Sequence, residues 1–217
     1  MSIRSIALLA ISAWLCAASP VIAADLHATV YDEGGTPLTD AVVVAYPDGF
    51  AIEVPKTSTE VEDQIKKEFV PYVKPVHVGT LVKFPNKDDI SHHVYSFSPA
   101  KRFELPLYRG TVASPVMFDK TGIVKLGCNI HDWMIGYLYV TDAPFFAKTE
   151  RQGRVDILQM PAGPYRVHVW HPRMFASEDS TIRHITVQES ASVEWRLKLN
   201  REFRARRTPL PDEPGYR

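Results

Sequence analysis

Three residues at equal spacing, Cys128, His131 and Met134, constrain this chain more than any other feature. They place a thiolate, an imidazole and a thioether at positions i, i+3 and i+6. Such soft and borderline ligands suit a transition metal rather than a hard cation. Apolar residues precede and follow them, which is typical of β-strands. The pattern predicts a metal-binding loop at Asn129–Met134, preceded by a strand that ends with Val124–Gly127.

A second imidazole stands upstream, where the segment Phe84-Pro85-Asn86-Lys87-Asp88 leads to His92 and His93. Two imidazoles and one thiolate, completed by a weak axial thioether, form the trigonal site that holds copper for electron transfer. Neighbouring strand residues point to opposite sides, so only one of the two histidines can face the metal. We favour His92, and a register shift of one residue would make His93 the ligand instead.

Each candidate ligand alone has a more ordinary explanation. Cys128 alone would be a small buried hydrophobe, His131 a surface residue, and Met134 beside Trp133 a core residue. Their joint spacing is what favours a metal. Zinc is a weaker candidate, because structural zinc sites rarely use Met. A catalytic Cys/His pair is also weaker, because it lacks a third group to orient the base. The remaining histidines show no ligand spacing and are expected to be solvated or core residues: His27, His77, His168, His171 and His184.

The beginning of the chain is typical of an export signal. Arg4 is followed by an apolar run and then by the small-residue cleavage site Val21-Ile22-Ala23. We therefore expect residues 1–23 to be a signal peptide and the mature chain to be periplasmic or secreted, with an uncleaved anchor as the alternative. After cleavage Cys128 is the only cysteine. In an oxidising compartment a lone thiol must be buried, paired between chains or bound to a metal.

The charge balance limits the partners. The chain has 217 residues, with 25 basic and 25 acidic side chains. This balanced charge lacks the excess of basic residues that is typical of a nucleic-acid-binding protein. It also lacks a basic amphipathic helix for a membrane surface, so we expect no membrane insertion after signal cleavage.

Strand patterns run through the whole chain. Leu26–Tyr31 and Val193–Leu199 alternate apolar and polar residues, turns recur at short intervals, and long helical patterns are absent. The prediction is an all-β chain, most simply two β-sandwiches. Residues 50–68 fit either a helix or an extended segment, and we favour the extended one. Residues 99–115 are expected to be loop with short strands, and residues 201–217 a disordered tail.

The layout Asn86-x-Asp88-x-x-x-His92, followed by Cys128-x-x-His131-x-x-Met134, resembles that of the cupredoxins, the family of plastocyanin, azurin and amicyanin. The resemblance covers about residues 60–142, and the short His-x-x-Met spacing is most similar to amicyanin. It implies a Greek-key β-sandwich with one type 1 copper ion held by His92, Cys128, His131 and an axial Met134. The chain also looks like exported plastocyanin-like proteins labelled "methylamine utilization protein".

One position departs from the family pattern. The cupredoxins usually have Asn directly after the first ligand histidine, where it ties the ligand loops together, and this chain has His93. The hydrogen bonding around the metal, and hence its reduction potential, is therefore expected to differ.

Residues on both sides of this region resemble a carboxypeptidase-regulatory-like (transthyretin-like) sandwich. Residues 28–46 are similar to its first half, and residues 149–167 are similar to its second half. We therefore expect a split sandwich formed by residues 24–54 and 145–200, with a cupredoxin domain at residues 55–144 inserted into it. Two separate modules are the alternative.

The resemblance implies a soluble one-electron carrier rather than an enzyme. The electron is expected to leave through His131, and Ile130, Trp133 and Tyr108 are candidates for an apolar patch that docks transient redox partner proteins. The alternatives are a copper-binding or copper-delivery module without electron transfer, and a purely structural sandwich with a vestigial site. Delivery proteins commonly use several Met or His, and the five Met here form no cluster.

Overall fold

The computed structural model describes residues 23–54, 58–110 and 114–201. The described residues form strands and two short 3-10 helices, and none of their helices is long and apolar enough to cross a membrane. The all-β prediction is confirmed. Most of the predicted signal peptide, up to residue 22, and residues 202–217 of the predicted tail lie outside the described residues.

The first two strands of the described residues are β1 (Ala23–Asp32) and β2 (Val42–Pro47). Those that follow are β3 (Thr59–Val61), β4 (Asp63–Ile65), β5 (Glu68–Val70), β6 (Val73–His77), β7 (Thr80–Lys83), β8 (His92–Ser98), β9 (Lys101–Tyr108), β10 (Val116–Phe118), β11 (Gly122–Cys128) and β12 (His131–Thr141). The last group contains β13 (Phe145–Lys148), η1 (Arg151–Gly153), β14 (Arg154–Pro161), β15 (Gly163–Trp170), η2 (Glu178–Thr181), β16 (Arg183–Val187) and β17 (Ser190–Leu197).

The first sandwich combines the first two described strands with the last five. One sheet has the order β14-β1-β17, and the other has the order β13-β2-β15-β16. β1 pairs antiparallel with β14 and parallel with β17, so it lies at the centre of its sheet. Its alternate residues Leu26, Ala28 and Val30 point inward and join a buried cluster with Tyr165 and Trp195 from β15 and β17. This alternation is what the period of a half-buried strand requires.

The second sandwich contains β3 to β12. A five-stranded sheet of order β6-β12-β11-β8-β9 packs over a three-stranded sheet of order β10-β7-β3, and β4 pairs with β5 at one side. Its core includes Phe84, Val94, Phe118, Leu126 and Leu138, together with the cysteine and a methionine of the predicted site. The predicted site thus lies at the end of a packed core, which restrains the side chains that form it.

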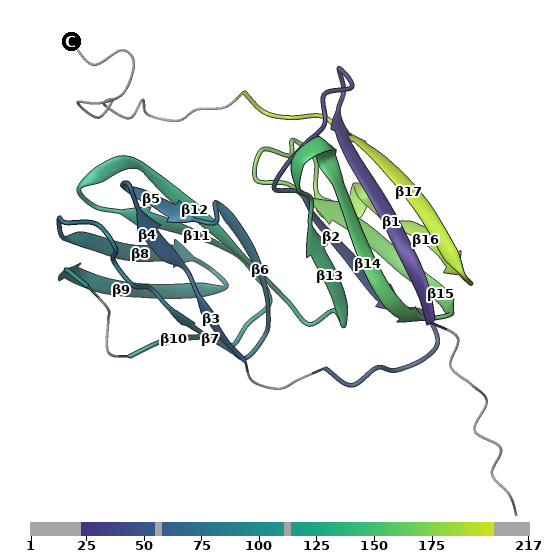
Figure 1. Ribbon diagram of the computed structural model, residues 1–217, viewed down its shortest axis with the longest axis horizontal. Helices are drawn as coiled ribbons and strands as arrows, with labels where there is room; N and C mark the ends of the chain where they lie inside the picture. Colours follow the sequence, from purple (N-terminus) through teal and green to yellow (C-terminus); the bar gives the residue numbers. More distant parts are fainter. Residues whose placement is uncertain (1–22, 55–57, 111–113, 202–217) are drawn as a thin grey trace, which may run out of the picture.

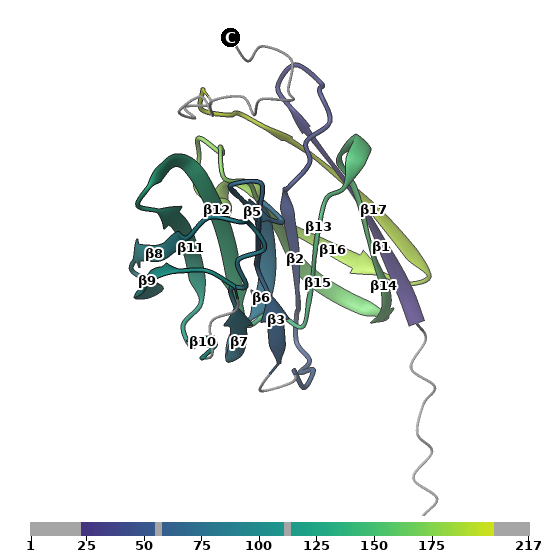
Figure 2. The ribbon, with the colours of Figure 1, turned by 60° about the vertical axis from the view of Figure 1, so that its left-hand side comes forward.

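The two sandwiches lie side by side, as Figures 1 and 2 show. A third buried cluster joins them, in which Val44 of β2 and Trp170 of β15 pack against Val73 of β6 and Tyr139 of β12. The hydroxyl of Tyr139 donates a hydrogen bond of 2.6 Å to Glu178. The outer face of the five-stranded sheet is therefore covered by the first sandwich at the end far from Cys128 and His131.

Two segments test the sequence patterns closely. The described residues between 50 and 68 contain β3, β4 and the start of β5 and no helix, which agrees with the extended alternative. Residues 99–115 differ from the expectation of loop with short strands, because β9 is a regular strand of eight residues. Pro106 is compatible with this strand because β9 lies at the edge of its sheet, where a missing N–H breaks no ladder.

Candidate metal centre

The hairpin of β11 and β12 brings the cysteine and the second histidine together. β11 ends at Cys128 and β12 begins at His131, so only Asn129 and Ile130 turn the chain. The register shifts after Gly127, and Cys128 then pairs with His131 across the hairpin. The loop is shorter than the sequence indicated, because His131 to Met134 already belong to β12.

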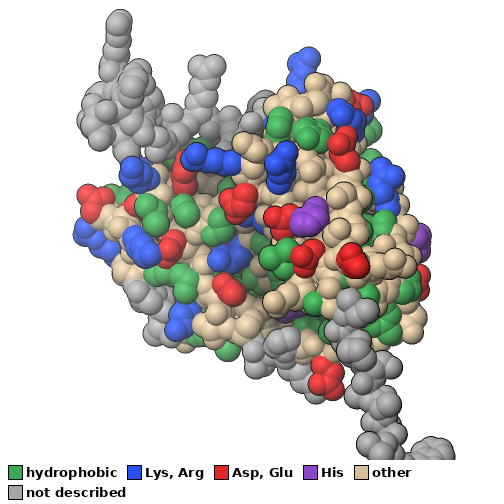
Figure 3. Space-filling view, turned by 45° about the vertical axis from the view of Figure 1, so that its right-hand side comes forward, with side chains coloured by type: hydrophobic (Ala, Val, Ile, Leu, Met, Phe, Trp, Pro, Cys, Tyr) green, Lys and Arg blue, Asp and Glu red, His purple; other side chains and the backbone are tan. Residues whose placement is uncertain are grey.

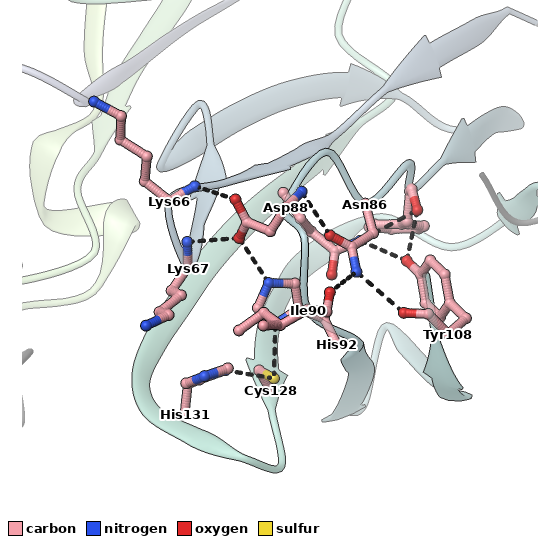
Figure 4. Close-up of polar contacts among 11 residues, drawn as sticks. Lys66, Lys67, Asn86, Asp88, Ile90, His92, Tyr108, Cys128 and His131 are labelled. Atoms are coloured by element: carbon pink, nitrogen blue, oxygen red, sulfur yellow. Dashed lines mark hydrogen bonds and ion pairs between the residues drawn. The ribbon is translucent and has the colours of Figure 1, made fainter. Parts of the chain in front are cut away.

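Three side chains converge at this end of the second sandwich, as Figure 4 shows. The Sγ atom of Cys128 lies 3.8 Å from Nδ1 of His92 and 3.6 Å from Nδ1 of His131. The two imidazole centroids are 5.0 Å apart. Among the residues that the structure describes, these three form the one group of His, Cys, Asp or Glu side chains whose ligand atoms lie within 4.8 Å of one another.

These spacings fit a metal ion placed between the three atoms. With metal–sulfur and metal–nitrogen bonds of about 2.3 and 2.0 Å, a trigonal arrangement separates sulfur from nitrogen by about 3.7 Å. The distances from Cys128 Sγ to the two Nδ1 atoms, 3.8 and 3.6 Å, bracket that value. One thiolate and two imidazoles are also the donor set that copper takes in trigonal sites.

The two candidate histidines of β8 point in opposite directions. His92 is fully buried and belongs to the converging group. His93 points away, and its Nε2 lies 2.8 Å from Oε1 of Glu104 on β9. The geometry therefore places His92 at the centre and pairs His93 with an exposed carboxylate. At the position where the cupredoxin pattern has Asn, this chain thus has a histidine that contacts Glu104.

A carboxylate holds His92 from behind. Asp88 Oδ2 accepts a hydrogen bond of 2.7 Å from the Nε2–H of His92. The main-chain N–H groups of Lys66 and Lys67 donate to the same carboxylate at 2.6 and 2.8 Å. Because Asp88 engages Nε2, Nδ1 is the ring nitrogen that faces Cys128, and it can bind a metal once its own proton has left. The sequence pattern contained Asp88, but its role as the partner of His92 was not predicted.

Asn86 fixes the loop that carries this carboxylate. Its Nδ2 donates to the carbonyl oxygens of Ile90 and Tyr108 at 2.8 and 3.0 Å, and its Oδ1 accepts from the N–H of Asp88 at 3.0 Å. All three of these hydrogen bonds join the Asn86 side chain to main-chain groups. The loop from Asn86 to β8 is therefore fixed by hydrogen bonds of the chain itself.

The local electrostatics favour the thiolate form of the cysteine. Burial alone would raise the pKa of Cys128, but hydrogen bonds from His92 and from the main-chain N–H groups of His93 and Ile130 outweigh it and lower that pKa. Burial likewise opposes the charged form of His92, yet Cys128 and Asp88 together raise the pKa of His92. Thiolate is the metal-binding form of cysteine, so the site is electrostatically prepared for a cation.

The second candidate histidine has a different environment. Burial and the neighbouring His92 lower the pKa of His131, which keeps its imidazole neutral and able to bind a metal. The ring of Trp133 lies 5.2 Å from that of His131, measured between centroids. His131 is partly exposed, whereas His92 is fully buried.

The remaining predicted residues lie around this group. Met134 is buried in the same core cluster as Cys128. Ile130 is exposed and Trp133 is partly exposed. Tyr108 is only partly exposed, and its hydroxyl donates inward to the carbonyl oxygen of Phe84.

Another polar cluster, away from the metal centre, had no sequence signal. His168 lies between the two sandwiches, with its Nε2 3.2 Å from the hydroxyl of Tyr139 and 3.3 Å from a carboxylate oxygen of Glu178. These residues come from β15, β12 and η2, so only the folded chain brings them together. Their arrangement ties β12, the strand of His131, to the first sandwich.

No protein-family model and no curated protein matches the chain, but solved structures resemble it. A purple cupredoxin from Nitrosopumilus maritimus is 21% identical and matches 39% of this chain and 100% of its own, with a TM-score of 0.34. An amicyanin variant with Cu(I) is 23% identical over 37% of this chain and 80% of its own, with a TM-score of 0.34. A copper-containing nitrite reductase from Thermus scotoductus is 22% identical over 44% of this chain and 25% of its own, with a TM-score of 0.37. In each case the likeness extends over less than half of this chain.

Proposed function

We propose that this chain is an exported type 1 copper protein that carries single electrons. The observation that supports the proposal most strongly is the convergence of His92 Nδ1, Cys128 Sγ and His131 Nδ1 within 4.8 Å. These three side chains are the proposed equatorial ligands of one copper ion. Met134, buried in the same cluster as Cys128, is the proposed axial ligand.

Copper supplies a one-electron couple at such a site, and the chain supplies fixed ligands. Asp88 holds His92 through a hydrogen bond, and the N–H groups of His93 and Ile130 hold the sulfur of Cys128. Ligands that are held in this way rearrange little between oxidation states. A small rearrangement is what fast electron transfer needs, so the geometry supports a carrier.

The burial of the ligands favours a carrier over a copper-delivery module. His92 and Cys128 are both buried, which closes the site to a second protein's ligands on that side. His131 is partly exposed and offers the edge through which an electron leaves. We propose that Ile130 and Trp133 surround this edge and dock transient redox partners, which need only small interfaces.

The charge distribution is compatible with weak and transient docking. In the face shown in Figure 3, Lys and Arg side chains are interspersed with Asp and Glu side chains. The whole chain has equal numbers of basic and acidic residues. A mixed surface of this kind favours partners that bind briefly rather than a polyanion.

We propose that the first sandwich is a transthyretin-like scaffold formed by residues 24–54 and 145–200, with the cupredoxin domain at residues 55–144 inserted into it. The path of the chain supports this division, because β1 and β2 pair with strands that follow β12. The proposed compartment is the periplasm or the exterior of the cell. We also propose that the chain belongs with the exported plastocyanin-like proteins that are labelled "methylamine utilization protein".

The proposed function has a direct test. The mature chain is expressed without metal and loaded with one equivalent of Cu(II), and its absorption is recorded through cycles of reduction and reoxidation. We expect an intense blue thiolate-to-copper band that bleaches and returns reversibly. A colourless protein that binds copper weakly would contradict the electron-carrier function.

A further inference from the structure

A pocket of about 530 Å3 lies directly behind Cys128, on the outer face of the five-stranded sheet. Tyr95 and Phe97 line it from β8, Lys125 lines it from β11, and Ile135 lines it from β12. These side chains point outward because their strand neighbours, such as Val94 and Leu126, point into the core. The pocket therefore reaches the metal centre from the side opposite the buried core.

One wall of the pocket consists of two aromatic side chains, one of which is largely exposed to solvent. The rings of Tyr95 and Phe97 lie 5.1 Å apart between centroids, with an angle of 40° between their planes. Phe97 is 70% exposed, which is unusual for so large an apolar side chain. A planar ring that enters the pocket gains aromatic contact with both residues, and such contacts add to the burial of apolar surface.

Only a glycine separates this wall from the metal ligand. Gly127 precedes Cys128 and is the register partner of Tyr95. A Cβ atom at Gly127 would lie 2.7 Å from Cζ of Tyr95, so the tyrosine ring occupies the space that any larger residue would need. A molecule bound against Tyr95 is thus one main-chain segment away from the sulfur of Cys128.

The rim of the pocket is polar and carries both signs of charge. Lys125 offers an ammonium donor, Asp132 offers a carboxylate acceptor, and Asn129 offers an amide. A few polar groups around an apolar wall are typical of sites for small organic molecules, and volumes of about 300–1,000 Å3 are usual for them. The complementary ligand is a flat, apolar body with hydroxyl groups at its ends.

We propose that this pocket binds a small planar aromatic diol of the hydroquinone or catechol class, which donates electrons to the carrier. This inference rests on the proposed function. One diol loses two electrons and two protons: the electrons reduce two Cu(II) carriers in turn, the protons pass to water, and a quinone leaves. The aromatic wall positions the diol beside Cys128, and Lys125 and Asp132 select for its hydroxyl groups.

The binding step is tested on the metal-free full-length chain with 2,7-dihydroxynaphthalene, a diol that forms no simple quinone. NMR titration should show saturable shifts at Tyr95, Phe97 and Lys125. Phe97→Ala should weaken binding about fivefold, as expected for the loss of one aromatic contact. Phe175→Ala is the matched control, because Phe175 is 65% exposed on the first sandwich. Equal binding by the two variants, or shifts outside the pocket, would overturn the inference.

A second pair of variants tests the polar rim. Lys125→Gln should weaken binding of the same diol about threefold, because a hydrogen bond to a charged group is lost in a solvated position. Lys198→Gln is its control, since Lys198 is exposed and lies over the ring of Phe175. A larger effect of Lys198→Gln than of Lys125→Gln would place the diol elsewhere and refute the site.

Reduction kinetics separate this inference from the proposed function. With the copper-loaded chain, the rate of bleaching by hydroquinone should level off as its concentration rises, and Phe97→Ala should raise the half-saturating concentration. Hexaammineruthenium(II), which needs no pocket, should bleach both proteins equally. A linear rate with hydroquinone refutes the pocket alone. Absence of any blue band refutes the proposed function. The titration of the metal-free chain then still shows whether the pocket binds the diol.

Discussion

Asp88 accepts a hydrogen bond of 2.7 Å from Nε2 of His92, on the side of the imidazole opposite Cys128. The same carboxylate receives the N–H groups of Lys66 and Lys67, both of which have left-handed backbone angles, with φ of 54° and 61°. The turn between β4 and β5 is thereby fixed to the loop before β8. One side chain thus orients the imidazole of His92, the proposed copper ligand, and joins two loops of the sandwich.

Replacing Asp88 with Asn should raise the reduction potential of the copper-loaded protein. Loss of one nearby negative charge disfavours Cu(II) relative to Cu(I) by on the order of 1–2 kcal/mol after solvent screening, or about 40–85 mV. Cyclic voltammetry of both proteins measures this shift. Copper affinity should also fall about tenfold or more, as is usual for lost partners of ligand histidines. An unchanged or lower potential would show that Asp88 does not act on the metal.

The two adjacent histidines should behave in opposite ways. His92→Ala removes a side chain of the converging group and should abolish the blue band. His93→Asn breaks the 2.8 Å contact with Glu104 and the ring contact with Tyr95, which lie outside the converging group, and should keep the band with a modest change in potential. Absorption spectra of the two copper-loaded variants provide the comparison. A band that survives in His92→Ala and vanishes in His93→Asn would reverse the ligand assignment.

The contact between the sandwiches should contribute to stability without affecting the metal. Burial and Glu178 raise the pKa of Tyr139, so its hydroxyl stays protonated and donates to that carboxylate. Tyr139→Phe leaves Glu178 and His168 without this partner and should lower the free energy of unfolding by about 1–3 kcal/mol. Urea denaturation measures the loss, and the blue band serves as the control. A stability equal to that of the wild type would mean that the contact is not maintained in solution.

A buried carboxyl should make stability depend on pH. Burial raises the pKa of Glu62 well above its ordinary value, and Lys74 offsets this only in part. Neither oxygen of Glu62 has a hydrogen-bond partner among the described residues. The folded state therefore keeps a proton that the unfolded chain releases above about pH 4.3. This contribution to stability is complete below that pH and is lost as pH rises through the folded pKa.

Glu62→Gln should remove this dependence and should be more stable than the wild type at alkaline pH. Denaturation of the metal-free chain at a series of pH values from 5 to 9 measures it, with the difference between the two proteins isolating Glu62. If the two curves stay parallel across that range, Glu62 is ionised in the folded protein and the argument from burial is wrong.

The sequence predicted what depends on local spacing. The period-two pattern identified the strands around Leu26 and Val193. Of the residues at steps of three from Cys128, His131 converges with Cys128 in the fold, and Met134 lies in the same buried cluster as Cys128. Alternation along β8 indicated that only one of His92 and His93 could join the group, and it left His93 as the alternative. Each of these predictions depends only on residues that are close together in the chain.

The sequence could not predict what depends on distant contacts. Asp88 has no pattern of its own as a hydrogen-bond partner, and its role requires the turn at Lys66 to fold over it. The approach of Tyr95 to Gly127 depends on the pairing of β8 with β11. The length of β9 differs from the expectation because Pro106 favours a loop in the sequence, although an edge strand accommodates it.

X-ray absorption at the copper edge reports the atoms around the metal, so it decides whether His92, Cys128 and His131 bind copper. For the oxidised wild-type chain we expect one short copper–sulfur bond and two copper–nitrogen bonds, at about 2.0–2.3 Å. Cys128→Ser should lose the short sulfur bond and keep the nitrogen shell. A wild-type spectrum with only nitrogen and oxygen neighbours would contradict the assignment of His92, Cys128 and His131 as the copper ligands.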